Sequence, residues 1–279
     1  MALTATTRTP PDVSNILYNI RTGEKEWQLI NSERVGDVAV LTLDDRARRN
    51  ALSHDMSVAL AKAVDRALAD DAKAIVLGAT PPVFCSGGSL DDLIEPKVPL
   101  RGMYEGFLRL AEAPVPTIAA VGGPAIGAGV NLPLACDVVI CTSAAVFDPR
   151  FLDVGIHPGG GHLWRLRSRV GPQAAAALVL LGEALDGEEA VARGLAWKCV
   201  ADDELMPTAL RLAQRAAGRD GELVARTKAS LRASGEVSGA AAAVELELKA
   251  QEWSVSRPGF VERVTALRDG LRTRQNNRR

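Results

Sequence analysis

Short apolar runs alternate with longer amphipathic segments over roughly the first 200 residues. Four runs have the length and composition of strands; they lie at residues 38–43, 73–77, 117–121 and 138–141. Between the first two, segment 54–70 repeats apolar side chains at helical spacing; these are Met56, Leu60, Ala61, Val64 and Leu68. A second helix is expected at 102–113. Strands that alternate with helices require crossover connections, so the pattern predicts a largely parallel sheet and an α/β fold.

From residue 171 onward the pattern is almost entirely helical, apart from a short strand expected near 197–200. Glycine-containing breaks at 218–221, 235–239 and 258–259 separate three further helices. The first residues are rich in threonine and lack the apolar core of a signal peptide, which predicts a flexible arm. We therefore expect an arm at 1–27, an α/β core at 28–200 and a helical C-terminal region at 201–279.

Composition narrows the class of protein. The chain has 33 Lys and Arg against 34 Asp and Glu, a balance that argues against a nucleic-acid-binding protein. Its longest apolar stretches fall short of a membrane span, so no membrane partner is expected and the cytoplasm is the default location. The four cysteines form no C-x-x-C pair and the three histidines no H-x-x-x-H pair, so no metal site is expected.

Two glycine-rich segments each follow a predicted strand. They read GATPPVFCSGGSLDDL at 78–93 and GGPAIGAGVNLPLACD at 122–137. Neither contains the P-loop, dinucleotide-binding or nucleophile-elbow pattern. Two interpretations remain. Backbone N–H groups of both turns could converge into an oxyanion hole, or the glycines could serve tight turns in a compact core.

Further motifs occur in order around these segments: RNALS at 49–53, FCSGGSLD at 84–91, PTIAAVGGPAIGAG at 116–129, ACD at 135–137, VGIHPGGG at 154–161, AVARGLA at 190–196 and GFVER at 259–263. In this order and spacing they resemble the crotonase (enoyl-CoA hydratase/isomerase) superfamily over roughly residues 35–270. The resemblance implies a spiral of ββα units with a C-terminal helical region that trimerises, and hence a homotrimer or hexamer. It also implies an acyl-CoA thioester as ligand, so that coenzyme A enters as part of the substrate and no separate cofactor is needed.

The resemblance also assigns the binding residues. By position, the backbone N–H groups of Gly88 and Ala128 would be the oxyanion donors. Substrate contacts would come from residues in or next to three of the motifs: Arg48, Arg49, Ala51, Ser86, Ser89, Leu90 and Phe260. The two arginines could bind CoA phosphates, or they could simply be solvent-exposed residues of a turn. Phe260 resembles the aromatic residue that a neighbouring subunit lends to the adenine pocket, and it could equally be a core residue of an amphipathic helix.

The chain departs from the family at the two glutamates that add water. Hydration needs a general base and a general acid in one cycle. Asn131 and Phe151 occupy the two positions, and neither side chain offers useful proton affinity. We therefore do not expect ordinary two-glutamate hydration, although the thioester site is retained.

Other side chains near the acyl pocket could supply proton chemistry. The aspartate that some isomerases and dehalogenases of the family carry is replaced by Gly159. His157 is the first candidate, because an imidazole titrates near neutrality; Asp153 and His162 follow it. In the alternative interpretation the histidines bond helix-end carbonyls and Asp153 is a turn carboxylate.

Three hypotheses follow. In the first, the protein is an acyl-CoA enzyme, a lyase or isomerase, that stabilises a thioester enolate in a backbone N–H oxyanion hole. In the second, it is a catalytically impaired acyl-CoA-binding protein of the same fold, which the Asn131 and Phe151 pair favours. A structural α/β subunit without CoA binding is the third.

Overall fold

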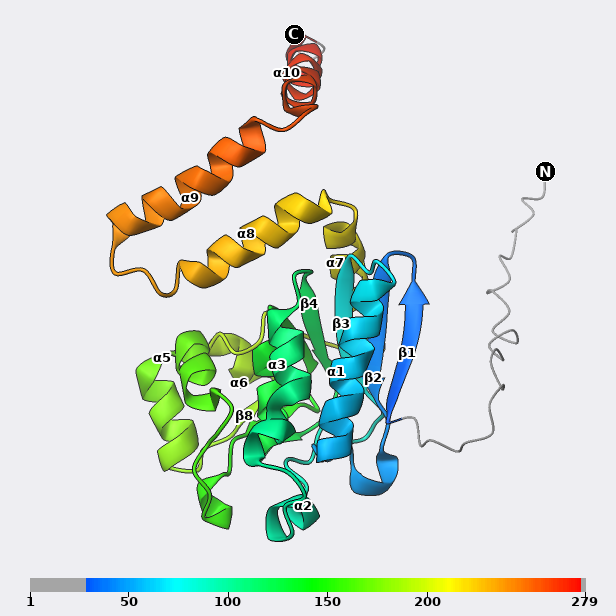
Figure 1. The fold of residues 1–279 in the computed structure, drawn as a ribbon, viewed down its shortest axis with the longest axis vertical. Helices are drawn as coiled ribbons and strands as arrows, with labels where there is room; N and C mark the ends of the chain where they lie inside the picture. Colours follow the sequence, from blue (N-terminus) through cyan, green and yellow to red (C-terminus); the bar gives the residue numbers. More distant parts are fainter. Residues whose placement is uncertain (1–28, 277–279) are drawn as a thin grey trace, which may run out of the picture.

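A computed structural model describes residues 29–276, so the arm expected at 1–27 lies outside the described residues. The core is a six-stranded sheet in the order β1-β2-β3-β4-β6-β9 (Figure 1). Its strands are β1 (Ile30–Val35), β2 (Val38–Leu43), β3 (Ala74–Ala79), β4 (Thr117–Val121), β6 (Val138–Thr142) and β9 (Lys198–Val200). Every pairing from β2 to β9 is parallel, so the α/β fold with a largely parallel sheet is confirmed.

The sequence pattern did not reveal β1. Its residues read INSERV and only Ile30 is buried, because this edge strand pairs with β2 on one side and faces solvent over most of its length. A strand with so little apolar surface has no periodic signal. The other predicted strands occur within one or two residues of their expected bounds.

Alternate residues of the central strands face two different hydrophobic layers. Along β2, Leu41 and Leu43 face the helices α1 (His54–Ala69) and α3 (Glu105–Glu112). Val38 and Val40 face the opposite side, where α7 (Leu205–Ala217) packs against the sheet. Helices on both faces are what a buried parallel sheet requires. The helix expected at 54–70 is confirmed, and its start is capped by the Ser53 side chain.

A second, three-stranded sheet lies beside the first and consists of β5 (Ala125–Ile126), β7 (Val146–Asp148) and β8 (Leu185–Asp186). The remaining core helices are α2 (Leu90–Ile94), α4 (Asn131–Ala135), α5 (His162–Leu180) and α6 (Gly187–Ala192). Short 3-10 helices connect them: η1 (Arg46–Arg48), η2 (Leu100–Tyr104), η3 (Gly127–Val130), η4 (Leu152–Val154) and η5 (Asp202–Glu204). The sequence pattern gave no indication of these five 3-10 helices.

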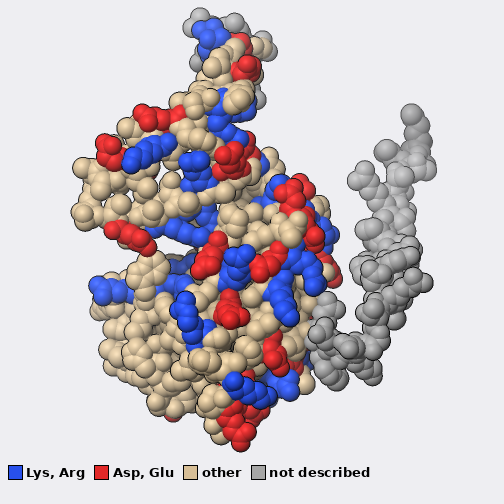
Figure 2. All heavy atoms as spheres, in the orientation of Figure 1, with Lys and Arg blue, Asp and Glu red and all other residues tan. Residues whose placement is uncertain are grey.

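Three further helices follow α7, as the glycine breaks predicted: α8 (Gly221–Ala233), α9 (Ala240–Val255) and α10 (Phe260–Asn276). Figure 1 shows α9 and α10 extending away from the core. On the face seen in Figure 2, basic and acidic side chains are mixed, in keeping with the even charge balance. Within residues 29–276 no helix is both long and apolar enough to cross a membrane.

An ion pair between a buried lysine and a partly buried aspartate fastens α8 to the core. The Lys228 ammonium lies 2.5 Å from the Asp137 carboxylate and donates to the Val115 carbonyl at 2.6 Å. Lys228 is only 7% exposed, and this burial lowers the pKa of its ammonium against the opposing effect of Asp137. Asp137 also accepts from the Thr117 backbone N–H at 2.8 Å, so one carboxylate joins α8 to the start of β4.

We predict that Lys228→Met lowers the free energy of unfolding by roughly 2–4 kcal/mol, because it removes the nearer cation of the partly buried Asp137 carboxylate and leaves it with the more distant Arg232 at 3.9 Å. Urea unfolding followed by circular dichroism measures the effect. The matched control is Lys62→Met at an exposed position of α1, where the change should stay within about 0.5 kcal/mol. Equal effects of the two substitutions would contradict this role for the ion pair.

Candidate active site

The two glycine-rich loops lie against each other. They follow the neighbouring parallel strands β3 and β4, whose carboxyl ends meet at the same edge of the sheet. Cys85 of the first loop and Ala125 of the second form a β-bridge. The Cys85 N–H donates to the Pro124 carbonyl at 3.1 Å, and the Ile126 N–H donates to the Cys85 carbonyl at 2.9 Å. The loops therefore hold each other by backbone hydrogen bonds.

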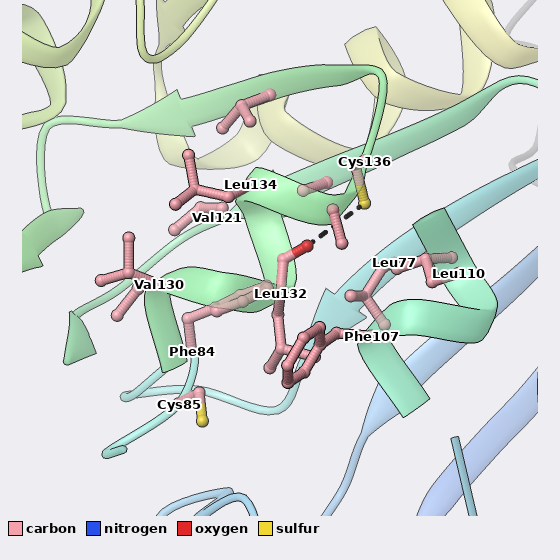
Figure 3. Close-up of a cluster of buried hydrophobic side chains, with 14 of the residues drawn as sticks. Leu77, Phe84, Cys85, Phe107, Leu110, Val121, Val130, Leu132, Leu134 and Cys136 are labelled. Carbon is pink, nitrogen blue, oxygen red and sulfur yellow. Dashed lines mark hydrogen bonds between the residues drawn. The ribbon is translucent and has the colours of Figure 1, made fainter. Parts of the chain in front are cut away.

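Buried side chains anchor both loops in the core. Figure 3 shows Phe84 and Cys85 of the first loop near Val130 and Leu132 of the second, with Phe107 of α3 beside them. Each of these side chains is at most 2% exposed. Residues on both sides of the loop tips are thus fixed by packing, which keeps the backbone of the tips in one position.

The contact between the loops requires glycine at position 129. A Cβ atom there would lie 2.6 Å from the Cys85 carbonyl oxygen and 2.9 Å from the Cys85 Cβ and Sγ atoms. Gly87 is needed for a different reason, since its φ of 110° lies in a region that side chains disfavour. The tight-turn interpretation of these glycines is therefore correct for Gly87 and Gly129, and it does not exclude a binding role for the neighbouring N–H groups.

The two residues expected to form the oxyanion hole are close together. A Cβ atom built on Gly88 would lie 3.8 Å from the Ala128 Cβ. Ala128 is the second residue of η3, so its N–H precedes the first hydrogen bond of that helix. Within residues 29–276 no backbone acceptor is recorded for the Gly88 N–H, whereas its neighbour Ser89 donates to Leu52.

Alanine is free of backbone strain at position 128. Within the described chain, the residues other than glycine with positive φ are Arg49, Asn50 and Asp71. Ala128 is not among them, so its side chain does not strain the backbone that carries the proposed donor N–H. The assignment of Gly88 and Ala128 as oxyanion donors stays a prediction, and the geometry of both loops is compatible with it.

The segment expected to contact coenzyme A lies next to the first loop. The Ser86 N–H donates to the Arg49 carbonyl at 3.1 Å, and the Ser86 hydroxyl donates to the Arg48 carbonyl at 3.2 Å. Ser89 caps α2, and Leu90 beside it is 62% exposed. The structure thus brings the predicted substrate residues of both motifs together; the arginines and Leu90 are exposed, whereas Ser89 is buried.

Asn50 holds this segment in place, a role that sequence reasoning missed. It is 1% exposed, and its amide donates to the carbonyls of Thr80 and Val83 at 3.0 and 2.8 Å. Its side-chain oxygen accepts from the Asp45 N–H at 2.8 Å. The adjacent arginines are exposed, with Arg48 3.3 Å from Asp45, so both interpretations of their role remain compatible with the structure. The sequence feature that could have indicated this role of Asn50 is its place inside the RNALS motif.

Phe260 does not lie with the other predicted substrate residues but in the C-terminal helical region. It begins α10 and lines a cavity of about 260 Å³ together with Leu223 of α8, Arg257 and Val264. Among the described residues, 29–276, no contact of Phe260 with the glycine-rich loops is recorded. Its expected part in an adenine pocket concerns a neighbouring subunit and stays a prediction.

The positions that match the two family glutamates are joined by a histidine. Asn131, at the start of α4, is 2% exposed and accepts a hydrogen bond of 2.9 Å on its side-chain oxygen from His162 Nδ1. The Phe151 ring packs edge-on against the His162 ring, with 4.9 Å between the centroids and an interplanar angle of 66°. Asn131, Phe151 and His162 therefore form one buried cluster.

The other two candidates for proton chemistry lie at the surface. His157 is exposed, and its Nδ1–H donates to the carbonyl of Pro158 at 2.7 Å. Asp153 is an exposed residue of η4. Neither has a hydrogen bond or ion pair to the Asn131 cluster within the described residues. His162 was ranked behind His157 by sequence reasoning, although its place directly after three glycines at a helix start was a usable signal.

The cluster holds its histidine in the neutral form. Burial and the nearby Arg165 guanidinium lower the pKa of His162 to about 4. The three cysteines Cys85, Cys136 and Cys141 are buried free thiols with pKa values raised by burial to about 11 or 12, which makes them unreactive at neutral pH. In the described part of the chain no group of three His, Cys, Asp or Glu side chains could hold a metal ion.

Comparison with known proteins identifies the family. The family model for enoyl-CoA hydratase/isomerase matches residues 33–265. A Mycobacterium tuberculosis protein named "probable enoyl-CoA hydratase EchA14" is 42% identical over 242 residues, covering 82% of this chain and 93% of its own. The 1,2-epoxyphenylacetyl-CoA isomerase of Escherichia coli is 34% identical over 190 residues, covering 64% of this chain and 72% of its own.

Solved structures show the same fold. An enoyl-CoA hydratase subunit of Geobacillus kaustophilus superposes with a TM-score of 0.80 at 26% identity, covering 87% of this chain and 95% of its own. A Thermobifida fusca protein solved in complex with CoA gives a TM-score of 0.75 at 30% identity, covering 82% and 93%.

We predict that Gly129→Ala lowers the free energy of unfolding by about 1–3 kcal/mol, because the new methyl group overlaps the Cys85 carbonyl and forces the loops apart. Urea unfolding measures the change. Gly218→Ala is the matched control, since its φ of −72° suits alanine and a Cβ there meets only ordinary contacts. A stability loss no larger than that of the control would show that the loops tolerate separation.

Proposed function

The chain belongs to the enoyl-CoA hydratase/isomerase family, and we propose that it stabilises the enolate of an acyl-CoA thioester with the backbone N–H groups of Gly88 and Ala128. The observation that carries this proposal is the proximity of these two residues, each with an N–H free of a backbone acceptor, on loops locked by the Cys85 contacts. An oxyanion hole requires such donors to be in place before charge develops.

The two donors act on the thioester oxygen. When a proton leaves the carbon next to the thioester, negative charge moves onto that oxygen, and two fixed N–H groups stabilise it more strongly than they stabilise the neutral carbonyl. Loss of one such donor typically costs about 3 kcal/mol of transition-state stabilisation. Backbone donors need no net positive charge on the protein, which is compatible with the net charge of −1.

The exposed segment beside the first loop is the proposed CoA site. Arg48 and Arg49 would face the phosphates, and Ala51, Ser86, Ser89 and Leu90 would line the path of the pantetheine arm. Support comes from the hydrogen bonds of Ser86 to the arginine segment and from the CoA complex of the Thermobifida fusca protein. Coenzyme A is then part of the substrate and not a separate cofactor.

The reaction we propose is not two-glutamate hydration. Asn131 and Phe151 stand at both glutamate positions, so the base and acid that hydration needs are missing there. The Escherichia coli relative, named an isomerase, shows that relatives at this level of identity differ in reaction. The same two residues favour an alternative, a protein that binds acyl-CoA without turning it over.

Self-association through the C-terminal helices is also proposed. No side chain of α9 is buried, and exposed apolar side chains lie along both outer helices. These side chains include Val244, Leu248, Val255, Val261, Leu267 and Leu271. Apolar surface of this extent usually marks a protein interface, and the family resemblance points to a homotrimer or a hexamer.

Light scattering after size exclusion tests the assembly. We predict a mass of three or six times the 29.5 kDa of one chain. Leu267→Glu should shift the population towards single chains, because a charge at an apolar interface must be desolvated without a partner. Lys62→Glu on α1 serves as the control for a change of charge alone. A wild-type protein that runs as a single chain would rule out this proposal.

Crotonyl-CoA hydration tests the reaction. We predict that the wild-type protein hydrates crotonyl-CoA at least about 100-fold more slowly than the Asn131→Glu/Phe151→Glu double variant, since each acid–base group contributes 10² or more. Absorbance of the conjugated thioester follows the reaction, and calorimetry checks that both proteins bind the ester. Faster hydration by the wild type than by the double variant would contradict the proposal. Binding without turnover of any enoyl-CoA tested would favour the binding protein.

A further inference from the structure

His162 is the titratable residue that touches both altered positions of the site. It is the first residue of α5, placed by a left-handed turn at Gly161, and it is 1% exposed. Its Nδ1 contacts Asn131 and its ring contacts Phe151. The residues at the two glutamate positions thus both contact one imidazole. Neither of them can take up a proton as that imidazole can.

The hydrogen bonds of Asn131 determine which nitrogen of His162 carries the proton. The Asn131 NH₂ group faces the Gly159 carbonyl at 3.4 Å, and a carbonyl only accepts. The oxygen of the same amide therefore faces His162, so Nδ1 must be the N–H that donates to it. The neutral imidazole then carries its lone pair on Nε2.

The lone pair on Nε2 has no partner. Nε2 is buried, and no hydrogen bond to it is recorded within residues 29–276. A buried polar atom without a partner has lost its hydrogen bonds to water without compensation, and such atoms are rare enough to call for an explanation. In a catalytic histidine, a second residue typically holds one ring nitrogen while the lone pair of the other nitrogen is free to take a proton. His162 has this arrangement, with Asn131 on Nδ1 and the lone pair on Nε2.

The surroundings suit a base that is neutral at rest. The charged group that acts on the imidazole is Arg165 of the same helix, whose guanidinium donates to the Gly160 carbonyl at 2.6 Å. The groups that face His162 from other elements, Asn131 and Phe151, are uncharged. With its pKa lowered to about 4, the imidazole has a proton affinity close to that of an unperturbed glutamate, which titrates near 4.3.

We propose that Nε2 of His162 is the base that removes a proton from the acyl chain, with Asn131 holding the imidazole in the required tautomer. This proposal rests on the function proposed above. Nε2 takes the proton from the α-carbon; the C–H electron pair forms a double bond to the thioester carbon, and the carbonyl pair moves onto the oxygen between Gly88 and Ala128. The imidazolium returns the proton to the α- or the γ-carbon.

One group that removes and returns a proton performs a 1,3-shift of a double bond. A β,γ-enoyl-CoA would become the α,β-isomer, with no water and no second acid required. His162 is 1% exposed and the Phe151 ring packs against its imidazole, so neighbouring side chains have to move before the acyl chain reaches Nε2. The substrate class is therefore an enoyl-CoA with an acidic α-proton, and the reaction class is isomerisation.

Proton exchange at the α-carbon tests this assignment directly. 3-Butenoyl-CoA is incubated with the protein in D₂O, and mass spectrometry follows deuterium uptake and conversion to crotonyl-CoA. His162→Asn is the decisive variant, because its amide can still donate to Asn131 from the position of Nδ1 but has no base at the position of Nε2. His162→Gln and His157→Ala are compared with it, and calorimetry gives the Kd of the ester for each.

We expect His162→Asn and His162→Gln to lose at least about 100-fold in exchange rate while Kd changes less than threefold. Exchange by His162→Asn within threefold of the wild type would overturn the proposal and leave His162 a purely structural residue. So would a larger loss in His157→Ala than in His162→Asn. If the wild type binds the ester but exchanges no proton, the base is refuted and the binding-protein alternative gains. If the wild type does not bind the ester, the proposed function itself fails.

Discussion

The contact between Cys85 and Gly129 is the constraint on which the rest of the site depends. The backbones of the two loops approach so closely that the position of a single Cβ atom would overlap a carbonyl oxygen. Because β3 and β4 are parallel neighbours, both loops leave the same edge of the sheet, and the β-bridge at Cys85 and Ala125 joins them there. The positions of Gly88 and Ala128 follow from this contact and need no contribution from their own side chains.

The buried core explains why that contact is rigid. Phe84, Cys85, Val130 and Leu132 flank the loop tips and are almost completely buried. Any movement that separates the loops has to expose apolar surface, at about 25 cal/mol per Å². The geometry of the two loops is therefore maintained by the same burial that stabilises the fold, and the backbone N–H groups proposed as donors would be in place before a ligand arrives.

The acid–base part of the site follows a different principle. At the two positions that the resemblance matches to the family's glutamates, this chain has an amide and a phenyl ring, and a neutral imidazole contacts both. Two buried carboxylates would have to be solvated or paired, whereas a neutral histidine and an asparagine can be buried with their hydrogen bonds mostly satisfied. The cost that remains is the Nε2 atom, which is buried and has no hydrogen-bond partner within residues 29–276.

Residue types and their spacing were sufficient to predict the parallel α/β core, the helix at 54–70, the C-terminal helices and the family, because periodic burial and glycine-rich turns leave a local record in the chain. They also showed that Asn131 and Phe151 cannot perform two-carboxylate chemistry. Local pattern could not reveal β1, whose polar residues pair only through the backbone, nor the short helices between the loops. Only the tertiary structure decided that Asn50 pins the arginine segment and that His162, not the exposed His157, lies against Asn131. Those contacts join residues about 30 positions apart, and spacing along a chain says nothing of which distant side chains meet once the chain is packed.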